Sequence, residues 1–313
     1  MGETVMDDAL LVIGDVVTDV VALHGSPVMT GTDTAADIVL RPGGSGANTA
    51  AWAACLGADV RLLAKLGYDS SEWHTTELVK TGVRPHFSVD SEHPTAVVIA
   101  MVDKSGERSM LTNRGAGGLI SDADWDPALL DGVGRLHLSG YILFAEGGLR
   151  LARRAMAEAA ARGVAISIDP ASTGPLRDFG VERFIQETAA ASLIIPNLDE
   201  ALILSGAPTA ERAAVLLSEA YGTAVVKLGA EGALAAVDGA VVATAAGVPA
   251  EVVDSTGAGD AFAAGFLAAA LHGAGEGAAL EAGCRAGAEC VAHVGGRPRY
   301  GLDLNRLYPI HTD

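Results

Sequence analysis

The clearest chemical signal in the 313-residue chain is the segment Asp254 to Asp260, which reads Asp-Ser-Thr-Gly-Ala-Gly-Asp. A short apolar run ends there and a helix is predicted to begin at Ala258. The backbone N–H groups of Gly257, Ala258 and Gly259 would then point into one concavity at the positive end of that helix. Such a nest of amides binds an anion without any lysine, and small side chains let a phosphate approach the backbone closely.

The carboxylate of Asp260 would repel a permanently bound phosphate, so it needs a chemical reason. We predict that it takes the proton from an attacking alcohol, which supplies roughly 10² to 10⁴ in rate, while the amides stabilise charge on the transferred group. The alternative is structural: Ser255 or Thr256 caps the helix and Asp260 favours its dipole. That alternative leaves Gly257 and Gly259 unexplained, because their flexibility costs stability.

A second glycine-rich segment, Arg41 to Asn48, precedes a predicted helix over Gly46–Leu56. Glycines such as Gly44 allow the backbone to approach a ligand, and the Asn48 amide offers hydroxyl groups both a donor and an acceptor. An ordinary turn before a helix explains the same residues equally well. Taken alone, this segment leaves both readings open.

Two carboxylates, Asp15 and Asp19, follow the first predicted strand, Leu10–Gly14. In extended chain they face the same side. The carboxyl end of a parallel strand is a suitable place to bind sugar hydroxyls. Asp15 also fits the simpler interpretation of a turn residue.

Two later strand ends carry polar residues. Asn197 and Glu200 have the spacing of a helix capping box, and the functional alternative places both near Mg²⁺ or its waters. Lys227 and Gly229 could border a nucleotide, or they could belong to a loop that enters a hairpin.

Short apolar runs alternate with helix-length periodic stretches along the chain. This pattern predicts an α/β fold with a doubly wound, mostly parallel sheet and helices on both faces. The predicted strands are Leu10–Gly14, Val60–Leu66, Leu136–Ser139, Val164–Asp169, Leu193–Ile195, Ala224–Leu228 and Val252–Val253, and the predicted helices are Gly46–Leu56, Ser71–Thr81, Gly148–Ala161, Leu198–Leu204, Ala210–Ala220, Ala258–Leu271 and Ala278–Val291. Residues 1–313 are expected to form a single domain.

Two segments without a convincing helix, about 18–41 and 87–112, break this alternation. The first holds strand-like pieces joined by a Gly/Pro/Thr-rich connection. The second reads as strands around a turn at Lys104-Ser105-Gly106. We predict that the two segments form a small β-sheet lid inserted into the main domain.

The composition excludes several classes of partner. A net charge of −18 argues against nucleic acid and against an anionic membrane surface, because both need clustered basic residues. The three cysteines, an odd number without metal-ligand spacing, are typical of free thiols in a reducing compartment. The acidic, polar start differs from a secretion signal, so we expect a cytoplasmic protein.

Familiar catalytic motifs are absent from the sequence: no P-loop, no His-Glu-x-x-His zinc motif and no Gly-x-Ser-x-Gly elbow. A dinucleotide-dependent reductase remains a competing hypothesis for the glycine-rich turn at Gly257. Its fingerprint, Gly-x-Gly-x-x-Gly, would place glycine where Phe262 stands, and it belongs in the first βα turn rather than near the end of the chain.

In this order, the segments resemble the ribokinase-like (PfkB) carbohydrate kinase family. Gly-Gly-Ser-Gly-Ala-Asn, residues 43–48, resembles its first signature. Asp254 to Asp260 resembles its second, Asp-Thr-x-Gly-Ala-Gly-Asp, from which Ser255 departs. The resemblance extends from Gly14 to about Pro298 and implies a large α/β domain with a β-sheet lid.

The resemblance also implies a role for each candidate residue. It implies that Asp260 is the catalytic base and that Gly257, Ala258 and Gly259 form the anion hole. On the nucleotide side, it implies that Asn197 and Glu200 organise Mg²⁺ and phosphate waters and that Lys227 and Gly229 border ATP. It further implies that Asp19, Gly44 and Asn48 bind substrate hydroxyls and that Asp254 and Thr256 bind an activating monovalent cation, K⁺. The cofactors would be ATP and Mg²⁺. Pairing of lids into a homodimer is a further expectation.

We therefore predict an ATP-dependent kinase that transfers the γ-phosphoryl group to a hydroxyl of a sugar or sugar-like substrate. Ser45 stands where ribokinases and sugar-phosphate kinases of the family often carry Lys, which weighs against ribose and phosphorylated sugars. Phe87 is the only aromatic residue from Pro85 to Thr112, which favours a sugar over a stacked nucleobase. A nucleoside kinase of the same family and a non-catalytic sugar or nucleotide sensor remain the alternatives.

Overall fold

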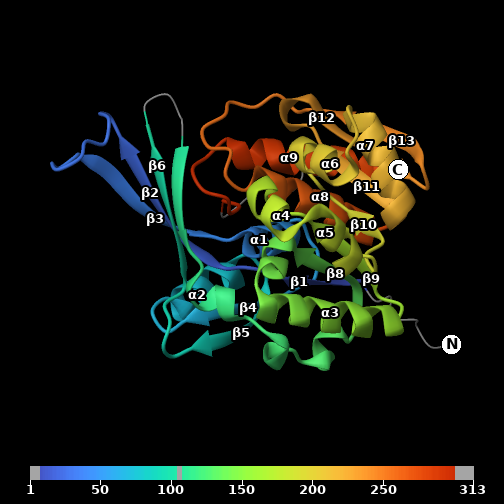
Figure 1. The fold of residues 1–313 in the computed structure, drawn as a ribbon, viewed down its shortest axis with the longest axis horizontal. Coiled ribbons are helices and arrows are strands. Elements are labelled where there is room, and N and C mark those ends of the chain that lie inside the picture. The colour runs from blue at the N-terminus through green and yellow to red at the C-terminus, as the bar shows by residue number, and fades with distance from the viewer. Residues whose placement is uncertain (1–7, 104–107, 300–313) are drawn as a thin grey trace.

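The computed structural model describes residues 8–103 and 108–299, and its main feature is a nine-stranded sheet with helices on both faces (Figure 1). The strand order is β13-β12-β11-β10-β9-β8-β1-β4-β5. The strands are β1 (Ala9–Ile13), β4 (Val60–Gly67), β5 (Arg84–Asp90), β8 (Val133–Ser139), β9 (Ala165–Asp169), β10 (Leu193–Ile194), β11 (Thr223–Lys227), β12 (Gly232–Val237) and β13 (Ala240–Ala246). Neighbours from β5 to β11 pair in parallel, and the β12–β13 hairpin is antiparallel. The predicted doubly wound, mostly parallel sheet is confirmed.

Strand β1 illustrates why the predicted strands are continuous apolar runs. All five of its residues are buried, because helices cover both faces of the sheet. Leu10 and Val12 pack toward one face, whereas Leu11 and Ile13 pack toward the other. Helices α1 (Ser45–Cys55), α2 (Ser71–Lys80), α8 (Ala258–Leu271) and α9 (Glu276–Val291) contribute to the first face, and α3 (Glu146–Ala161), α4 (Thr173–Phe179), α5 (Val181–Glu187), α6 (Leu198–Ser205) and α7 (Ala210–Tyr221) contribute to the second.

The strand order reverses beside β1. The chain passes from β1 to β4 and β5 on one side, and it later builds β8, β9, β10 and β11 on the other. At such a point the loops after neighbouring strands diverge and leave a crevice at the carboxyl ends of the strands, which is where open α/β sheets bind ligands. The loops that follow β1 and β8 are therefore expected to border the site.

A separate four-stranded sheet projects from the main body (Figure 1). It has the order β3-β2-β6-β7 and consists of β2 (Val17–His24), β3 (Ala36–Gly43), β6 (Ala96–Val102) and β7 (Arg108–Asn113). We call it the lid. One boundary was wrong: Phe87 to Asp90, predicted as lid, belong to β5 in the main sheet, where they pair with β4. The predicted turn at 104–106 lies outside the described residues.

Other expectations about the elements also need correction. The predicted strand Val252–Val253 is wrong: the segment is exposed and belongs to no strand, and the Val253 and Asp254 amides donate to the Val291 carbonyl. The short helices α4 and α5 were not predicted. No helix within residues 8–103 and 108–299 has the length and apolar character needed to cross a membrane.

Candidate active site

Two helix starts meet at the carboxyl edge of the sheet. Helix α8 begins after Gly257, whose left-handed backbone (φ 77°, ψ 0°) is followed at once by helical residues. A left-handed residue next to right-handed ones turns successive amides toward one side, which makes an anion nest. Gly257 cannot be replaced freely, because a Cβ there would also lie 2.4 Å from the Cα of Gly296. Gly257 thus has the backbone of the predicted turn, while the Ala258 amide donates to the Ser255 carbonyl over 3.4 Å; convergence of the three amides on an anion stays a prediction.

Asp260 lies in the first turn of α8, and helix α1 holds its carboxylate. The Ser45 hydroxyl donates to Oδ1 over 2.8 Å, and the Asn48 side-chain amide donates to Oδ2 over 2.9 Å. Burial raises the pKa of Asp260 to about 7, although the bonds from Asn48 and Ser45 oppose that rise. A carboxyl group with a pKa near neutrality is suited to accept a proton from an alcohol and release it again.

A cation lies beside the amides, contrary to the expectation of an anion site without any lysine. The Lys227 ammonium is 3.4 Å from the position that a Cβ would take on Gly259, and it contacts Asp169 Oδ2 at 2.5 Å. Burial lowers the pKa of Lys227, but the carboxylates of Asp169 and Glu200 more than offset this and leave the pKa raised. The ammonium is therefore charged and is fixed next to the start of α8.

Asn197 and Glu200 form the capping box that their spacing allowed. The Glu200 carboxylate accepts from the Asn197 backbone amide over 2.9 Å and from its side-chain amide over 2.7 Å, and Asn197 Oδ1 accepts from the Glu200 amide over 2.9 Å. Burial, followed by repulsion from Asp169, raises the pKa of Glu200 to about 7. The residues lie close to Lys227, with which Asn197 forms a parallel β-bridge.

Asp15 and Asp19 have different surroundings. Asp15 accepts from the backbone amides of Gly46 (3.1 Å) and Ser45 (3.3 Å), so it anchors the start of α1. Asp19, on lid strand β2, packs against Gly43 at the end of β3. Burial and repulsion from Asp15 raise the pKa of Asp19 to about 7. The structure thus favours the interpretation of Asp15 as a turn residue. It places Asp19 on the lid, close to where the lid joins the main sheet.

The remaining predicted residues occupy the loops around these groups. Gly44 has a positive φ of 96° and precedes α1. Gly229 opens the turn after β11. Asp254 closes a loop by accepting from the Thr256 amide through Oδ1 and from the Gly295 amide through Oδ2, both over 2.9 Å.

Sequence reasoning missed three residues of the site: Ser45 as a partner of Asp260, Asp169 and Arg297. It predicted Lys227 but not its proximity to the amides. Asp169 ends β9 and could have been found from its place at the carboxyl end of a predicted parallel strand. Arg297 carries no local signal, because it reaches the site only through the packing of the segment that follows α9. Its Nε donates to Asn48 Oδ1 over 2.9 Å.

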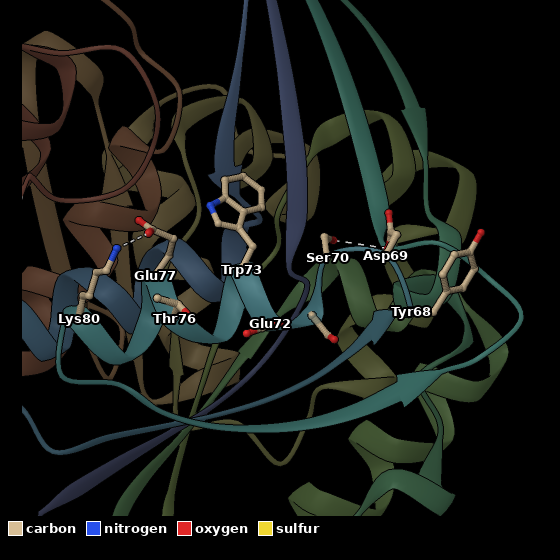
Figure 2. Close-up of a pocket in the computed structure, with 9 residues that line it drawn as sticks. Tyr68, Asp69, Ser70, Glu72, Trp73, Thr76, Glu77 and Lys80 are labelled. Carbon is tan, nitrogen blue, oxygen red and sulfur yellow. Dashed lines mark hydrogen bonds and ion pairs between the residues drawn. The ribbon is translucent and has the colours of Figure 1, made fainter.

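A pocket of about 590 Å³ lies elsewhere, along helix α2 and the turn before it (Figure 2). Trp73 points from α2 toward the lid strands, and the Lys80–Glu77 ion pair closes the other end. None of the site residues predicted from the sequence lines this pocket. Within the described ranges, no group of three or more His, Cys, Asp or Glu side chains could hold a metal ion.

The doubly wound sheet, the small lid and the paired helix starts define a ribokinase-like protein. The chain belongs to the pfkB family of carbohydrate kinases, whose model matches residues 7–299. Among curated proteins, it is 31% identical over 167 residues to the bifunctional protein HldE of Shewanella denitrificans. That stretch is 51% of this chain and 32% of HldE, so the chain spans about a third of the curated relative that it matches.

Solved structures resemble the chain over nearly its whole length. The adenosine kinase of Sinorhizobium meliloti superposes with a TM-score of 0.86 and 25% identity, covering 95% of this chain and 97% of that one. An Escherichia coli protein assigned as a ribokinase II, solved with ATP and Mg²⁺, superposes with a TM-score of 0.83 and 25% identity, covering 92% of this chain and 94% of that one. The ribokinase of Thermotoga maritima superposes with a TM-score of 0.77 and 26% identity, covering 92% of this chain and 94% of that one.

Proposed function

We propose that this chain is an ATP-dependent kinase that transfers the γ-phosphoryl group to a hydroxyl of a sugar or sugar-like substrate. One observation carries the proposal. The carboxylate of Asp260, with a pKa of about 7, is held by Ser45 and Asn48 at a helix start where Gly257 has the left-handed backbone typical of an anion nest. A protein that only bound its ligand would gain nothing from a carboxylate fixed next to an anion site.

Asp260 acts as the general base in this proposal. The acceptor hydroxyl gives its proton to the carboxylate, its oxygen attacks the γ-phosphorus, and the bond to the leaving ADP breaks. The amides of Gly257, Ala258 and Gly259 stabilise charge on the transferred group. Lys227 adds a positive charge beside them, since its ammonium lies next to Gly259. Positioning and charge stabilisation supply most of the catalysis.

Three further residues hold the acceptor: Asp19, Gly44 and Asn48. Asp19 and Gly44 lie where the lid joins the main sheet, and Asn48 already contacts Asp260. Closure of the lid over this crevice would exclude water and limit hydrolysis of ATP.

The nucleotide side takes ATP with Mg²⁺, in keeping with the ATP and Mg²⁺ found in the Escherichia coli structure. Mg²⁺ neutralises phosphate charge when it is bound. Asn197 and Glu200 organise its waters, while Lys227 and Gly229 border the nucleotide. Because both oxygens of Glu200 already serve the capping box, we assign Glu200 a role through water rather than through direct coordination.

A monovalent cation, K⁺, is proposed beside Asp254 and Thr256. The Asp254 carboxylate ties the loop before α8 to Gly295, which follows α9. A cation bound to this loop would fix the start of α8 and with it the amide nest.

Dimerisation through the lid remains a proposal with a physical basis. Pairing register places Ile38, Leu40, Ile99 and Leu111 on one face of the lid, and their exposed fractions are 63%, 58%, 37% and 59%. A second copy that covered this apolar face would remove it from water. The three cysteines are free, which keeps a cytoplasmic location as our prediction.

A nucleoside kinase is the second candidate function. The likeness to the adenosine kinase of Sinorhizobium meliloti favours it. The lid weighs against it: Phe87 lies in β5 and packs on the core, so the four lid strands carry no Phe, Trp or Tyr on which a nucleobase could stack.

An acceptor panel tests the proposal. Purified protein is incubated with ATP and Mg²⁺, with and without K⁺, against free sugars, sugar acids and nucleosides, and ADP release is measured. We expect one group of sugars or related alcohols to stimulate release well above the water background, and K⁺ to increase it. Stimulation by nucleosides alone would select the second candidate. Ligand-induced stabilisation without ADP release would contradict both and leave a sensor.

A further inference from the structure

The segment Gly295–Arg297, which follows α9, packs against the starts of both site helices. A Cβ on Gly296 would lie 2.5 Å from Asn48 Nδ2, so the backbone passes directly over the Asn48 side chain. The Gly296 carbonyl accepts from the Trp52 indole over 2.9 Å. These contacts fix the segment and deliver the Arg297 side chain to the first turn of α1.

Arg297 donates hydrogen bonds to Asn48 and Gly43. Its Nε donates to Asn48 Oδ1 over 2.9 Å, and its Nη2 donates to the Gly43 carbonyl over 3.0 Å. The guanidinium presents these donors in a rigid plane, so the second bond restrains the direction of the first. Arg297 therefore holds one particular end of the Asn48 amide.

The other end of that amide faces the catalytic carboxylate. Asn48 Nδ2 donates to Asp260 Oδ2 over 2.9 Å. An amide has its acceptor and its donors at opposite corners, so engagement of Oδ1 by Arg297 leaves Nδ2 for Asp260. Rotation of the amide by half a turn would set Oδ1 against the carboxylate and the NH₂ group against the guanidinium, and both contacts would be repulsive.

We propose that Arg297 is a positioning residue, which orients the Asn48 amide and through it holds the Asp260 carboxylate ready to accept a proton. This inference rests on the proposed role of Asp260. It assigns a function to a residue outside both sequence signatures. The predicted consequence of losing Arg297 is an Asn48 amide that is free to turn and a carboxylate that has lost a fixed donor.

Loss of the Asn48 donor should change the pKa of Asp260 in a definite direction. The bond from Asn48 lowers the pKa of Asp260, so its loss raises that pKa further. The other groups that act on Asp260 come from other elements: Asp169 in β9, Lys227 in β11, Tyr141 after β8 and Cys290 in α9, besides Ser45 in α1. Residue 297 lies on none of these elements.

The test compares Arg297→Met and Arg297→Lys with the control Arg299→Met, which removes an exposed arginine two residues further on. For Arg297→Met we expect kcat to fall about tenfold, because a hydrogen bond to a charged group is lost. Loss of the charge also raises the pKa of Asp19, so the acceptor KM is compared in Arg297→Lys, which keeps the charge. The acid limb of kcat against pH should move up by about one unit. Arg297→Lys keeps the charge but lacks the planar pair of donors, so it should behave like Arg297→Met.

A second readout needs no substrate. With ¹³C-carboxyl aspartate, the Asp260 resonance is identified as the one that Asp260→Asn removes, and its titration is followed by NMR. It should titrate at higher pH in both Arg297 variants than in the unchanged protein and in Arg299→Met. A merely structural role would lower the melting temperature and leave this titration unchanged.

Several outcomes would overturn the inference: an unchanged Asp260 titration in Arg297→Met, full recovery in Arg297→Lys, or an Asn48→Ala/Arg297→Met double variant that is about tenfold slower than Asn48→Ala alone. Residues that act through one another should not add in this way. Failure of the proposed function would look different. Asp260→Asn itself would then keep its turnover, whatever residue 297 does.

Discussion

Helices α6 and α8 start at the same edge of the sheet, and each carries an acid in its first turn, which is buried for Glu200 and half-buried for Asp260. Burial raises the pKa of both Glu200 and Asp260 to about 7. The acids differ in the partners that hold them. Glu200 is bound by Asn197, the cap of its own helix, whereas Asp260 is bound by Ser45 and Asn48 from a different helix.

This difference separates a structural acid from a chemical one. The capping box accounts for Glu200 without any ligand, because it satisfies the free amides at the start of α6. Asp260 caps nothing: the residue before its helix, Gly257, makes no side-chain cap, and the acid is fixed by tertiary contacts alone. We infer that the residues at the start of α8 serve the reaction, whereas those at the start of α6 mainly stabilise their helix.

The largest expected effect comes from exchanging each acid for its amide. Asp260→Asn should cut turnover at least ~100-fold, because the base is lost, while ATP binding stays nearly intact. Glu200→Gln should cut turnover far less. Steady-state kinetics and ATP binding by calorimetry measure both. Equal losses in the two variants would erase the distinction drawn between the two helix starts.

The next effect concerns the cation between the two helices. Lys227→Met should slow turnover and also destabilise the protein by about 3 kcal/mol, because the buried carboxylate of Asp169 loses its partner. The double variant Asp169→Asn/Lys227→Met is the matched control, since it removes both charges. It should recover stability without recovering turnover. If turnover returned as well, Lys227 would have no part in the reaction.

Stability should depend on pH in a direction that the raised pKa values fix. An acid whose pKa is about 7 in the folded state and about 4 when unfolded binds protons better in the folded state. The unfolding free energy therefore falls as pH rises from about 4 to 7. Asp260→Asn removes one such group, so its melting temperature relative to the unchanged protein should rise between pH 5 and pH 8. A constant difference would show that Asp260 titrates normally.

The smallest effect is expected at the cap of α6. Asn197→Ala removes the acceptor for the Glu200 amide and should cost about 1 kcal/mol of stability by urea unfolding. Asn197→Ser, whose hydroxyl can still cap without placing a second carboxylate beside Glu200, serves as the control. A much larger loss of turnover than of stability would move Asn197 from the structural to the chemical group.

Much of the main domain could be predicted because local sequence patterns indicate its helices and strands. The predicted helix Ala258–Leu271 matches α8 at both ends. Residues Phe87–Asp90 of strand β5 were assigned to the lid because an edge strand of the sheet alternates in the same way as a lid strand, and only pairing with β4 decides between them. Helices α4 and α5 each have seven residues, and the periodicity is hidden by Gly174 and Pro175 at the start of α4 and by Gly180 between the helices.

The candidate site was predictable in its glycines and acids, but not in its long-range partners. The nest and Asp260 lie within one segment, so spacing alone indicates them. The contacts of Asp260 with Ser45 and of Asn48 with Arg297 join residues more than 200 positions apart. No local pattern encodes such contacts, because they arise when the starts of α1 and α8 pack together.

The central claim is that Asp260 accepts the proton of the acceptor hydroxyl, and single-turnover phosphoryl transfer as a function of pH tests it most directly. With ATP and the best acceptor saturating, we predict a rate that rises with pH through a single acid limb centred near pH 7, and no such limb in the residual rate of Asp260→Asn. A rate that stays flat from pH 5 to pH 9, or a limb that survives in Asp260→Asn, would contradict the account.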